Sequence, residues 1–422
     1  MNWFCAQIGA REHYAVARAL QQEDKLTALY TDFWAGPITR HVAFGKLRSL
    51  ATRWHPDPAR KNSRAEIVSW NFRALWWEIL LRRYRSEARF NTPSANCSAA
   101  SPYHGYIEVG RRFAKRVQED LKRRKGLHAN SILYAYDTGA LEAFTWARGQ
   151  DLKCVLNQMD PNRFEVDLVK AEEREWPGWA LKSIQVPEEY FIRREQEWAL
   201  ADRIVVNSEF SRQAIQQQGV PADKLVVIPL CYEIDESNRK PEIRSRKSDH
   251  PLQVLFLGQV ILRKGIQYLM AAARQLENEN IRFNIIGPVG ISTEAAAGAP
   301  RNMTFHGRMN RDQTANWYKK SHLFVLPTLS DGFAITQLEA MAHGLPVVAT
   351  PCCGKVIDNG VDGFTIAARD AEALAQTFRR YLSEPDLLPS QSAAALIKAQ
   401  QFNLKRLGEN LKHLETDLKH AH

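Results

Sequence analysis

Two carboxylates, Asp331 and Glu339, lie eight residues apart in a stretch whose pattern predicts a strand followed by a helix. Residues 322–326 are an apolar run closed by a proline, which is typical of a strand buried on both faces of a parallel sheet. Apolar side chains then recur at helical spacing from residue 335 onward. Asp331 is therefore expected at the mouth of the helix, and Glu339 about two turns further along it.

The backbone at this junction is suited to hold an anion. A helix start leaves N–H groups without partners and carries a partial positive charge, which favours a ligand such as a diphosphate. A glycine lets the backbone approach that ligand closely. The residues expected to form this seat are Gly332, Phe333, Ala334, Ile335 and Thr336.

The elements around the two carboxylates form one β-α-β unit. His343 and Gly344 are expected to end the helix, and residues 346–350 then predict the next buried strand. Taken alone, the D-x7-E spacing has a second explanation, in which Asp331 caps the helix and Glu339 is a solvated carboxylate.

The same stretch resembles a known family. Asp331 to Glu339 and the following AMAHGLPVVAT are similar to the E-x7-E motif and the trailing EAMAxGxPVVAT in family 4 of the retaining glycosyltransferases, with aspartate replacing the first glutamate. The resemblance implies an α/β fold of the GT-B type, with two Rossmann-like, doubly wound parallel-sheet domains facing across a cleft. It also implies transfer of a sugar from a nucleoside-diphosphate sugar to a glycan, lipid or small-molecule acceptor, with retention of the anomeric configuration. Asp331 would stabilise or orient the donor sugar, and Glu339 would hold the ribose.

A second motif, GQVILRKG from Gly258 to Gly265, follows another predicted strand. Gly258 permits a turn, while Arg263 and Lys264 place two cations just before a helix, suited to neutralising a diphosphate leaving group. The family carries arginine directly after the first glycine and lysine before the second, so Lys264 matches and Gln259 does not. Arg263 would supply the missing charge, and neither a metal nor a cofactor is then required. A solvated basic turn is the alternative.

The resemblance adds three positions to the expected donor site. Residues 3–8 predict a first strand, and Gly9 begins the turn into a helix expected over residues 12–22, although this turn is not the dinucleotide fingerprint G-x-G-x-x-G. In relatives the first turn lies across the cleft from the donor phosphates. Gly307 and Arg308 fall where relatives pack a nucleotide base.

Asp160 is the second expected catalytic residue. It follows the strand predicted over residues 153–159, and Asp137 ends the strand predicted over residues 131–136. Ligands of open α/β sheets gather at the carboxyl ends of the strands. Family members place a histidine and an aspartate here, but in this chain Met159 stands at the histidine position. An aspartate that caps the turn before a proline is the alternative for Asp160.

The predicted elements divide the chain into two domains. Residues 1–230 form the expected acceptor-side domain, and residues 252–400 the expected nucleotide-sugar-binding domain. The polar segment 231–251 is the expected linker between them. Residues 401–422 are expected to form a helix that packs back across the cleft. The pattern also predicts a cationic helix over residues 113–125, and a loop over residues 293–300.

The composition is that of an ordinary globular protein. Of 422 residues, 45% are hydrophobic and 25% are charged, and no stretch is apolar enough to span a bilayer. The beginning of the chain lacks the pattern of a secretion signal. The six cysteines form no C-x-x-C pair, which indicates reduced thiols in the cytoplasm and no structural metal site.

The net charge of +10 is concentrated in one region, since residues 46–125 hold 19 Lys and Arg against 7 Asp and Glu. Residues 44–125 also contain four tryptophans, a composition that fits peripheral contact with an anionic membrane, at the inner membrane face. A core-packing helix with a solvated rim fits equally well. Nucleic acid is not expected as a partner, because no nucleic-acid-binding motif accompanies the charge.

Two other functions remain open at this level. A nucleotide-sugar epimerase shares the expected architecture. A catalytically silent glycosyltransferase-like scaffold protein would explain the departures from the family at Gln259, Met159 and Lys355. The sequence leaves open the donor base, the sugar, the acceptor and the oligomeric state.

Overall fold

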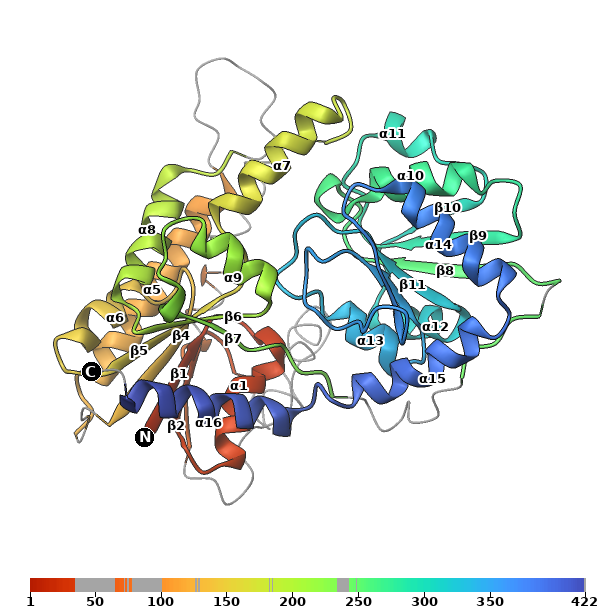
Figure 1. The fold of residues 1–422 in the computed structure, drawn as a ribbon. Helices are drawn as coiled ribbons and strands as arrows, with labels where there is room; N and C mark the ends of the chain where they lie inside the picture. Colours follow the sequence, from red (N-terminus) through yellow and green to blue (C-terminus); the bar gives the residue numbers. More distant parts are fainter. Residues whose placement is uncertain are drawn as a thin grey trace, which may run out of the picture.

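Two α/β units lie side by side in the computed structural model (Figure 1). It describes residues 1–34, 65–71, 73, 76–77, 101–125, 127, 130–181, 183, 185–233, 243–247 and 249–420. Each unit is built on a parallel sheet whose strands are short apolar runs covered by helices on both faces. Among the described helices, none combines the length and apolarity that crossing a bilayer requires.

The N-terminal sheet has seven strands in the order β3-β2-β1-β4-β5-β6-β7, and neighbouring strands are parallel. The strands are β1 (Asn2–Gln7), β2 (Leu26–Thr31), β3 (Glu66–Ser69), β4 (Ser131–Tyr136), β5 (Lys153–Gln158), β6 (Arg203–Val206) and β7 (Leu225–Val227). The helices are α1 (Ala15–Gln22), α5 (Pro102–Leu121), α6 (Leu141–Arg148), α7 (Arg163–Glu175), α8 (Glu188–Leu200) and α9 (Glu209–Gln216). Phe113 of α5, Phe144 of α6 and Trp198 of α8 belong to the apolar core on one face of the sheet.

The C-terminal sheet has six strands in the order β10-β9-β8-β11-β12-β13. The strands are β8 (Leu252–Leu257), β9 (Ile281–Ile286), β10 (Met303–Gly307), β11 (Leu323–Leu326), β12 (Val347–Ala349) and β13 (Gly363–Thr365). The helices are α10 (Ile266–Gln275), α11 (Thr293–Ala297), α12 (Arg311–Lys320), α13 (Thr336–Ala342), α14 (Ala371–Ser383) and α15 (Leu387–Ala399). The reversal of strand order between β8 and β11 creates a switch point, where an open sheet of this kind binds ligands.

The last helix, α16 (Leu404–His420), returns to the N-terminal unit and packs against α1 (Figure 1). Leu407, Leu411 and Leu414 enter the apolar core on that face of the N-terminal sheet. Glu415 accepts a hydrogen bond from the N-terminal amino group at 3.0 Å and one from Trp3 Nε1 at 3.3 Å. The two ends of the chain are therefore held together.

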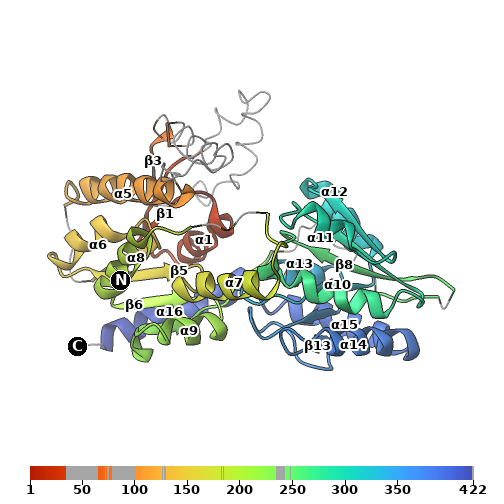
Figure 2. The ribbon, with the colours of Figure 1, turned by 90° about the horizontal axis from the view of Figure 1, so that it is seen from above.

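The carboxyl ends of the two sheets meet. A methyl group at Gly332, just after β11, would lie 2.3 Å from the carbonyl oxygen of Met159, just after β5. The helix α7 reaches from the N-terminal unit to α10 of the other (Figure 2). There the buried carboxylate of Glu172 accepts hydrogen bonds from Gln267 Nε2 and Tyr268 Oη at 3.0 Å each. The loops that follow β5 and β11 are thus packed against each other.

Three predicted elements differ from the structure. The helix expected over residues 12–22 begins at Ala15, because the three preceding residues have left-handed backbone angles. The cationic helix expected over residues 113–125 begins at Pro102 and ends at Leu121 as α5; Ser101 caps it, and proline favours a first helical turn. The loop expected over residues 293–300 contains α11, whose start is capped by Ser292.

The basic, tryptophan-rich region 44–125 lies largely outside the described residues. Within it the structure describes residues 65–71, 73, 76–77 and 101–125. Trp76 is 73% exposed, whereas its neighbour Trp77 is buried against Phe113 of α5. The exposed Trp76 is compatible with the predicted membrane contact and the buried Trp77 with the core-packing alternative, so the membrane contact stays a prediction.

Candidate active site between the two domains

Lys264 and Asp331 are joined directly, since Lys264 Nζ contacts Asp331 Oδ2. The turn that presents the lysine ends at Gly265, which has φ +73°. A methyl group at Gly265 would lie 1.8 Å from the carbonyl oxygen of Pro327, so only glycine allows this turn to pack against the end of β11. The two sequence motifs are thereby brought together in space.

The backbone after Asp331 differs from the expected helix start. The helix α13 begins at Thr336, and Ala334 has φ +63°, so Asp331 is not its cap. The Asp331 N–H instead donates to the carbonyl oxygen of Cys352 at 2.9 Å. The N–H groups of Phe333, Ala334 and Ile335 donate no hydrogen bond to any residue that the structure describes. They are available to an external acceptor, although from a turn rather than from a first helical turn.

Glu339 lies in the middle of α13, where Tyr318 Oη donates a hydrogen bond to its Oε2 at 2.8 Å. Burial raises the pKa of Tyr318 well above its usual value, and the charge of Glu339 raises it further, so this hydroxyl remains a donor. Glu339 lines a cavity of about 500 Å³ that we call the Glu339 pocket. Its opposite wall comes from the N-terminal unit through Glu12, His13 and Arg18.

The expected base-binding positions lie beside this pocket and not on its wall. Gly307 ends β10 with φ +72°, and Arg308 is exposed. The pocket is lined instead by the next residues, Met309 and Asn310, and by Thr314 of α12. The base contact expected at Gly307 and Arg308 stays a prediction.

Gly9 presents the first turn of the N-terminal unit to the cleft with φ +75°, and its N–H donates to Asp32 Oδ1 at 2.8 Å. The following residues Glu12, His13 and Tyr14 all have positive φ. Such backbone strain in three consecutive residues is held by the surrounding structure and is typical of functional sites. Burial raises the pKa of Glu12 to about 7, so this wall of the Glu339 pocket titrates near neutral pH.

Gly258 and Arg263 take structural positions at the base of the cleft. A methyl group at Gly287, after β9, would lie 1.8 Å from the carbonyl oxygen of Gly258, so the two strand ends are tightly packed. The guanidinium of Arg263 donates to the carbonyl oxygen of Ser330 at 2.8 Å and to Glu165 Oε2 at 3.2 Å. The positive charge of Arg263 is thus shared with a carboxylate of the other domain.

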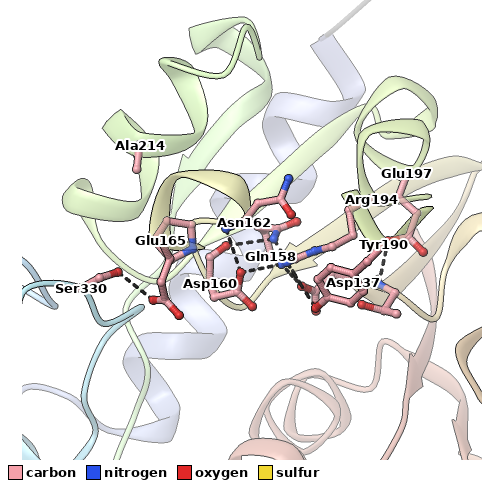
Figure 3. A network of polar contacts seen from close by, with 12 residues as sticks. Asp137, Gln158, Asp160, Asn162, Glu165, Tyr190, Arg194, Glu197, Ala214 and Ser330 are labelled. Carbon is pink, nitrogen blue, oxygen red and sulfur yellow. Dashed lines mark hydrogen bonds and ion pairs between the residues drawn. The ribbon is translucent and has the colours of Figure 1, made fainter. Parts of the chain in front are cut away.

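Asp160 is held by a buried cation (Figure 3). The guanidinium of Arg194 donates to Asp160 Oδ1 at 2.9 Å and also to Asp137 Oδ2. Burial alone would raise the pKa of Asp160, but the charge of Arg194 and the N–H of Asn162 outweigh it and lower the pKa below its ordinary value. With 38% of its side chain exposed, Asp160 offers the cleft a carboxylate that is ionised at neutral pH and is a weak base.

Glu165, at the start of α7, was missed by sequence reasoning. Its Oε2 accepts hydrogen bonds from Arg263 and from Ser330 Oγ, the latter at 2.7 Å (Figure 3). Burial raises the pKa of Glu165; Arg263 opposes this effect, while the charges of Asp160 and Asp331 add to it. The carboxylates of both domains therefore converge on one small region of the cleft.

Arg194 was also missed, although a signal existed. Phe191, Arg194 and Trp198 are spaced three and four residues apart and therefore share one helical face. An arginine between two apolar residues on such a face is buried with a carboxylate partner more often than alone. Its actual partners, Asp137 and Asp160, come from strand ends far along the chain.

The site combines two features that suit substitution at a sugar carbon. Lys264, with the free N–H groups after Gly332, supplies positive potential where a leaving diphosphate would gather charge. Asp160 and Asp331 supply negative charge, which stabilises positive charge on a reacting sugar. Among the described residues, no cluster of three or more His, Cys, Asp or Glu side chains could hold a metal ion.

Solved structures share the fold of this chain. A sucrose-phosphate synthase from Thermosynechococcus elongatus aligns over 100% of both chains with a TM-score of 0.64 at 15% identity. The structure of Anabaena HepE in complex with UDP and glucose aligns over 99% of both chains with a TM-score of 0.55 at 13% identity. The chain has the GT-B fold, and the predicted fold class is confirmed.

Residues 251–384, in the C-terminal domain, match the family model described as glycosyl transferases group 1. A D-inositol 3-phosphate glycosyltransferase from Streptomyces griseus is 29% identical over 166 residues, which cover 35% of this chain and 35% of the relative. One from Geodermatophilus obscurus is 27% identical over 248 residues, covering 53% and 54%. The chain thus spans about a third to a half of the length of these curated relatives.

Proposed function

We propose that the chain transfers a sugar from a nucleoside-diphosphate sugar to an acceptor hydroxyl, with retention of the anomeric configuration. The observation that carries this proposal is the contact between Lys264 and Asp331 beside the Glu339 pocket, within a group 1 glycosyltransferase domain. The nucleoside would occupy the Glu339 pocket, and Glu339 would accept hydrogen bonds from the ribose. The diphosphate would then extend toward Lys264 and the N–H groups of Phe333 to Ile335.

In the reaction, the bond between the anomeric carbon and the diphosphate oxygen breaks, and a bond from that carbon to the acceptor oxygen forms on the same face. The proton of the acceptor hydroxyl passes to the departing diphosphate oxygen. Lys264 offsets the charge that develops on the diphosphate, so no metal ion is needed. Arg263 contributes less than expected, because Glu165 already shares its charge. Asp331 orients the sugar, and ionised Asp160 stabilises positive charge near the anomeric carbon.

A thermal-shift screen of UDP-, GDP- and ADP-sugars identifies the donor, since a ligand that binds only the folded state raises the melting temperature. Donor consumption and the anomeric configuration of the product are then followed by NMR. Lys264→Ala should lower kcat by about a hundredfold, the usual effect of removing one group that stabilises transition-state charge. Asp331→Asn should also lower kcat, whereas Glu339→Gln should mainly raise KM for the donor.

The matched control is Lys320→Ala, which removes an exposed lysine from α12 and should leave turnover unchanged. Undiminished turnover in the Lys264, Asp331 and Glu339 variants would refute the site. A product that carries a free anomeric hydroxyl and forms without an acceptor would show that the chain is an epimerase rather than a transferase.

We further propose that the acceptor is a glycan or a lipid-linked sugar at an anionic membrane face. The support is the exposed Trp76 and the exposed cations of α5 and the turn after it, namely Arg112, Lys115, Lys122, Arg123 and Lys125. Cosedimentation with vesicles of phosphatidylglycerol and phosphatidylcholine tests this contact. Binding should require the anionic lipid and weaken in high salt, and equal binding to pure phosphatidylcholine would contradict it.

A further inference from the structure

We propose that a second cavity in the cleft, the α7 pocket, binds an electrically neutral, polyhydroxylated acceptor: a sugar unit without a phosphate group. This inference rests on the proposed function and names the substrate class for its acceptor side. The α7 pocket has a volume of about 270 Å³ and is lined by Tyr103, by one face of α7, and by Gln259 to Arg263 of the C-terminal domain.

The inner end of the α7 pocket lies at the reaction centre. Glu165 lines the pocket and is tied by hydrogen bonds to Ser330, the residue before Asp331. The Glu339 pocket, on the other hand, shares no lining residue with the α7 pocket. The two cavities are therefore separate, so that one can hold a nucleoside while the other holds an acceptor.

The charge of the α7 pocket is balanced. Arg263 is neutralised by Glu165 at 3.2 Å, and Lys170 lies one helical turn from Glu173 on the same wall. A phosphate group needs unpaired cations or free N–H donors that are directed at it. In the described part of this pocket, each basic side chain instead has an acidic neighbour, and Glu165 would repel a phosphate.

The other lining groups suit a sugar. Val166, Val169 and Ile261 offer apolar surface to the C–H faces of a pyranose ring. Tyr103 packs edge-on against Tyr190, with ring centroids 4.8 Å apart, which fixes its position. Burial raises the pKa of Tyr103 to about 12, so its hydroxyl remains a hydrogen-bond donor at physiological pH. Within the part of the chain that the structure describes, the second carboxylate oxygen of Glu165, Oε1, accepts no hydrogen bond, so it can accept one from an acceptor hydroxyl.

The two curated relatives described above are named for D-inositol 3-phosphate, a phosphorylated compound, so the proposed acceptor class differs from the one in their names. The test uses the full chain with the donor found by thermal shift. Release of nucleoside diphosphate is measured with methyl glucoside, methyl galactoside and methyl mannoside, and with the three corresponding hexose 6-phosphates. At least one neutral glycoside should exceed its phosphorylated counterpart about tenfold in kcat/KM, and the reverse preference would overturn the inference.

Two substitutions on α7 make the test specific. Glu173→Gln leaves Lys170 unopposed, and should shift the kcat/KM ratio about fivefold toward the hexose 6-phosphate. The matched control is Glu175→Gln, which makes the same charge change at an exposed position outside the pocket and should leave the ratio unchanged. Equal shifts in the two variants would contradict a role for the α7 pocket.

Tyr103→Phe separates acceptor recognition from donor binding. It should raise KM for the neutral glycoside about tenfold while the thermal shift produced by the donor stays the same. An unchanged KM would overturn the inference. If no nucleotide sugar shifts the melting temperature of the wild type, the proposed function itself fails; if a donor binds and phosphorylated acceptors are preferred, only the acceptor class is wrong.

Discussion

Arg194 keeps Asp160, the aspartate that follows β5, in its ionised form. Only 1% of this side chain is exposed, and its guanidinium contacts both Asp137 and Asp160. Burying an arginine costs free energy of folding unless its partners are well placed. We therefore infer that the role of Arg194 is to fix the position of Asp160 rather than to stabilise the fold locally. The result is a cleft carboxylate that stays ionised well into the acidic range.

Replacing this cation should be strongly destabilising. In Arg194→Met, Asp137 would remain buried without its main partner, and the free energy of unfolding at pH 7 should fall by about 3 to 5 kcal/mol. Urea denaturation measures the change. Arg212→Met is the control, because Arg212 contacts the exposed Glu209 and its loss should cost about 0.5 kcal/mol or less. Equal losses in the two variants would argue against a buried network.

The same substitution should change the pH dependence of turnover. Arg194 lowers the pKa of Asp160, so in the wild type Asp160 loses its charge only below the ordinary range of aspartate. In Arg194→Met the opposing effect of burial remains, and the pKa of Asp160 must rise. The acidic limb of the kcat/KM profile should therefore move to higher pH, while Arg194→Lys should keep it near its wild-type position. If the acidic limb of the profile does not move in Arg194→Met, Asp160 is not one of the ionised groups on which turnover depends.

At this scale, the sequence indicated residues whose position follows from local pattern. Asp331 and Lys264 were each expected after a strand of the C-terminal domain, and the structure places their side chains in contact. Their roles in donor binding stay predictions. Arg194 and Glu165 were not predicted, because each acts on residues far away in the sequence, and no local pattern records such pairs.

Among the elements, the turn between β8 and α10 positions Lys264. Its geometry depends on Gly265, whose left-handed backbone lies directly against the end of β11. The glycine is therefore needed twice, for its backbone angle and for the absence of a side chain.

Gly265→Ala, compared with a control glycine that also has a positive φ, should separate the effect of close packing from the effect of backbone strain. The new methyl group would meet the carbonyl of Pro327, so we expect a loss of more than 2 kcal/mol in the free energy of unfolding and a drop in kcat as Lys264 moves. Gly219→Ala is the control, since Gly219 has φ +92° with nothing within 4 Å of the added methyl group. It should lose about 1 kcal/mol and keep full activity. Similar losses of stability and activity in both would contradict the close packing.

The strands in the middle of both sheets were predicted because they are mostly apolar, as parallel sheets covered on both faces require. The strands β3 and β13, each at one edge of its sheet, were not predicted. The helix α7 was not predicted. Eight of its 13 residues are charged, and its one fully buried side chain, Glu172, is polar because it accepts hydrogen bonds from the other domain. An amphipathic pattern is the signal for helices that pack on their own sheet, and α7 spans the cleft instead.

In the whole molecule, α16 connects the C-terminal end of the chain to the N-terminal unit. The carboxylate of Glu415 accepts from the N-terminal amino group, from Lys25, from Lys419 and from Trp3. Burial acts to raise the pKa of Glu415, but these four hydrogen bonds prevail and lower it to about 2.

This shift predicts acid sensitivity. Because the folded pKa lies below the unfolded value of about 4.5, the ionised Glu415 stabilises the fold above pH 4.5, and this contribution disappears as the pH falls toward 2. At pH 7, the free energy of unfolding of Glu415→Gln should be about 3 kcal/mol lower than that of the wild type. Near pH 2, the two proteins should be almost equally stable. Glu409→Gln, on the exposed side of α16, should show no such difference. A loss in Glu415→Gln that is independent of pH would contradict the shift.

The two-domain GT-B architecture followed from the resemblance of the stretch around Asp331 to family 4 of the retaining glycosyltransferases, and the solved structures with the same fold confirm it. The mutual placement of the domains did not follow from the sequence. It depends on the packing of Gly332 against Met159 and of α7 against α10. The hydrophobic periodicity of the sequence does not predict such contacts between domains.

The most direct test of the donor site is calorimetric titration of UDP, GDP and ADP into the wild type, Lys264→Ala and Glu339→Gln. One diphosphate should bind the wild type at a single site, and each substitution should weaken that binding about tenfold, since each removes a charged hydrogen-bonding partner. Failure of all three nucleotides to bind the wild type, or equal affinities in all three proteins, would contradict a nucleotide-sugar site in this cleft.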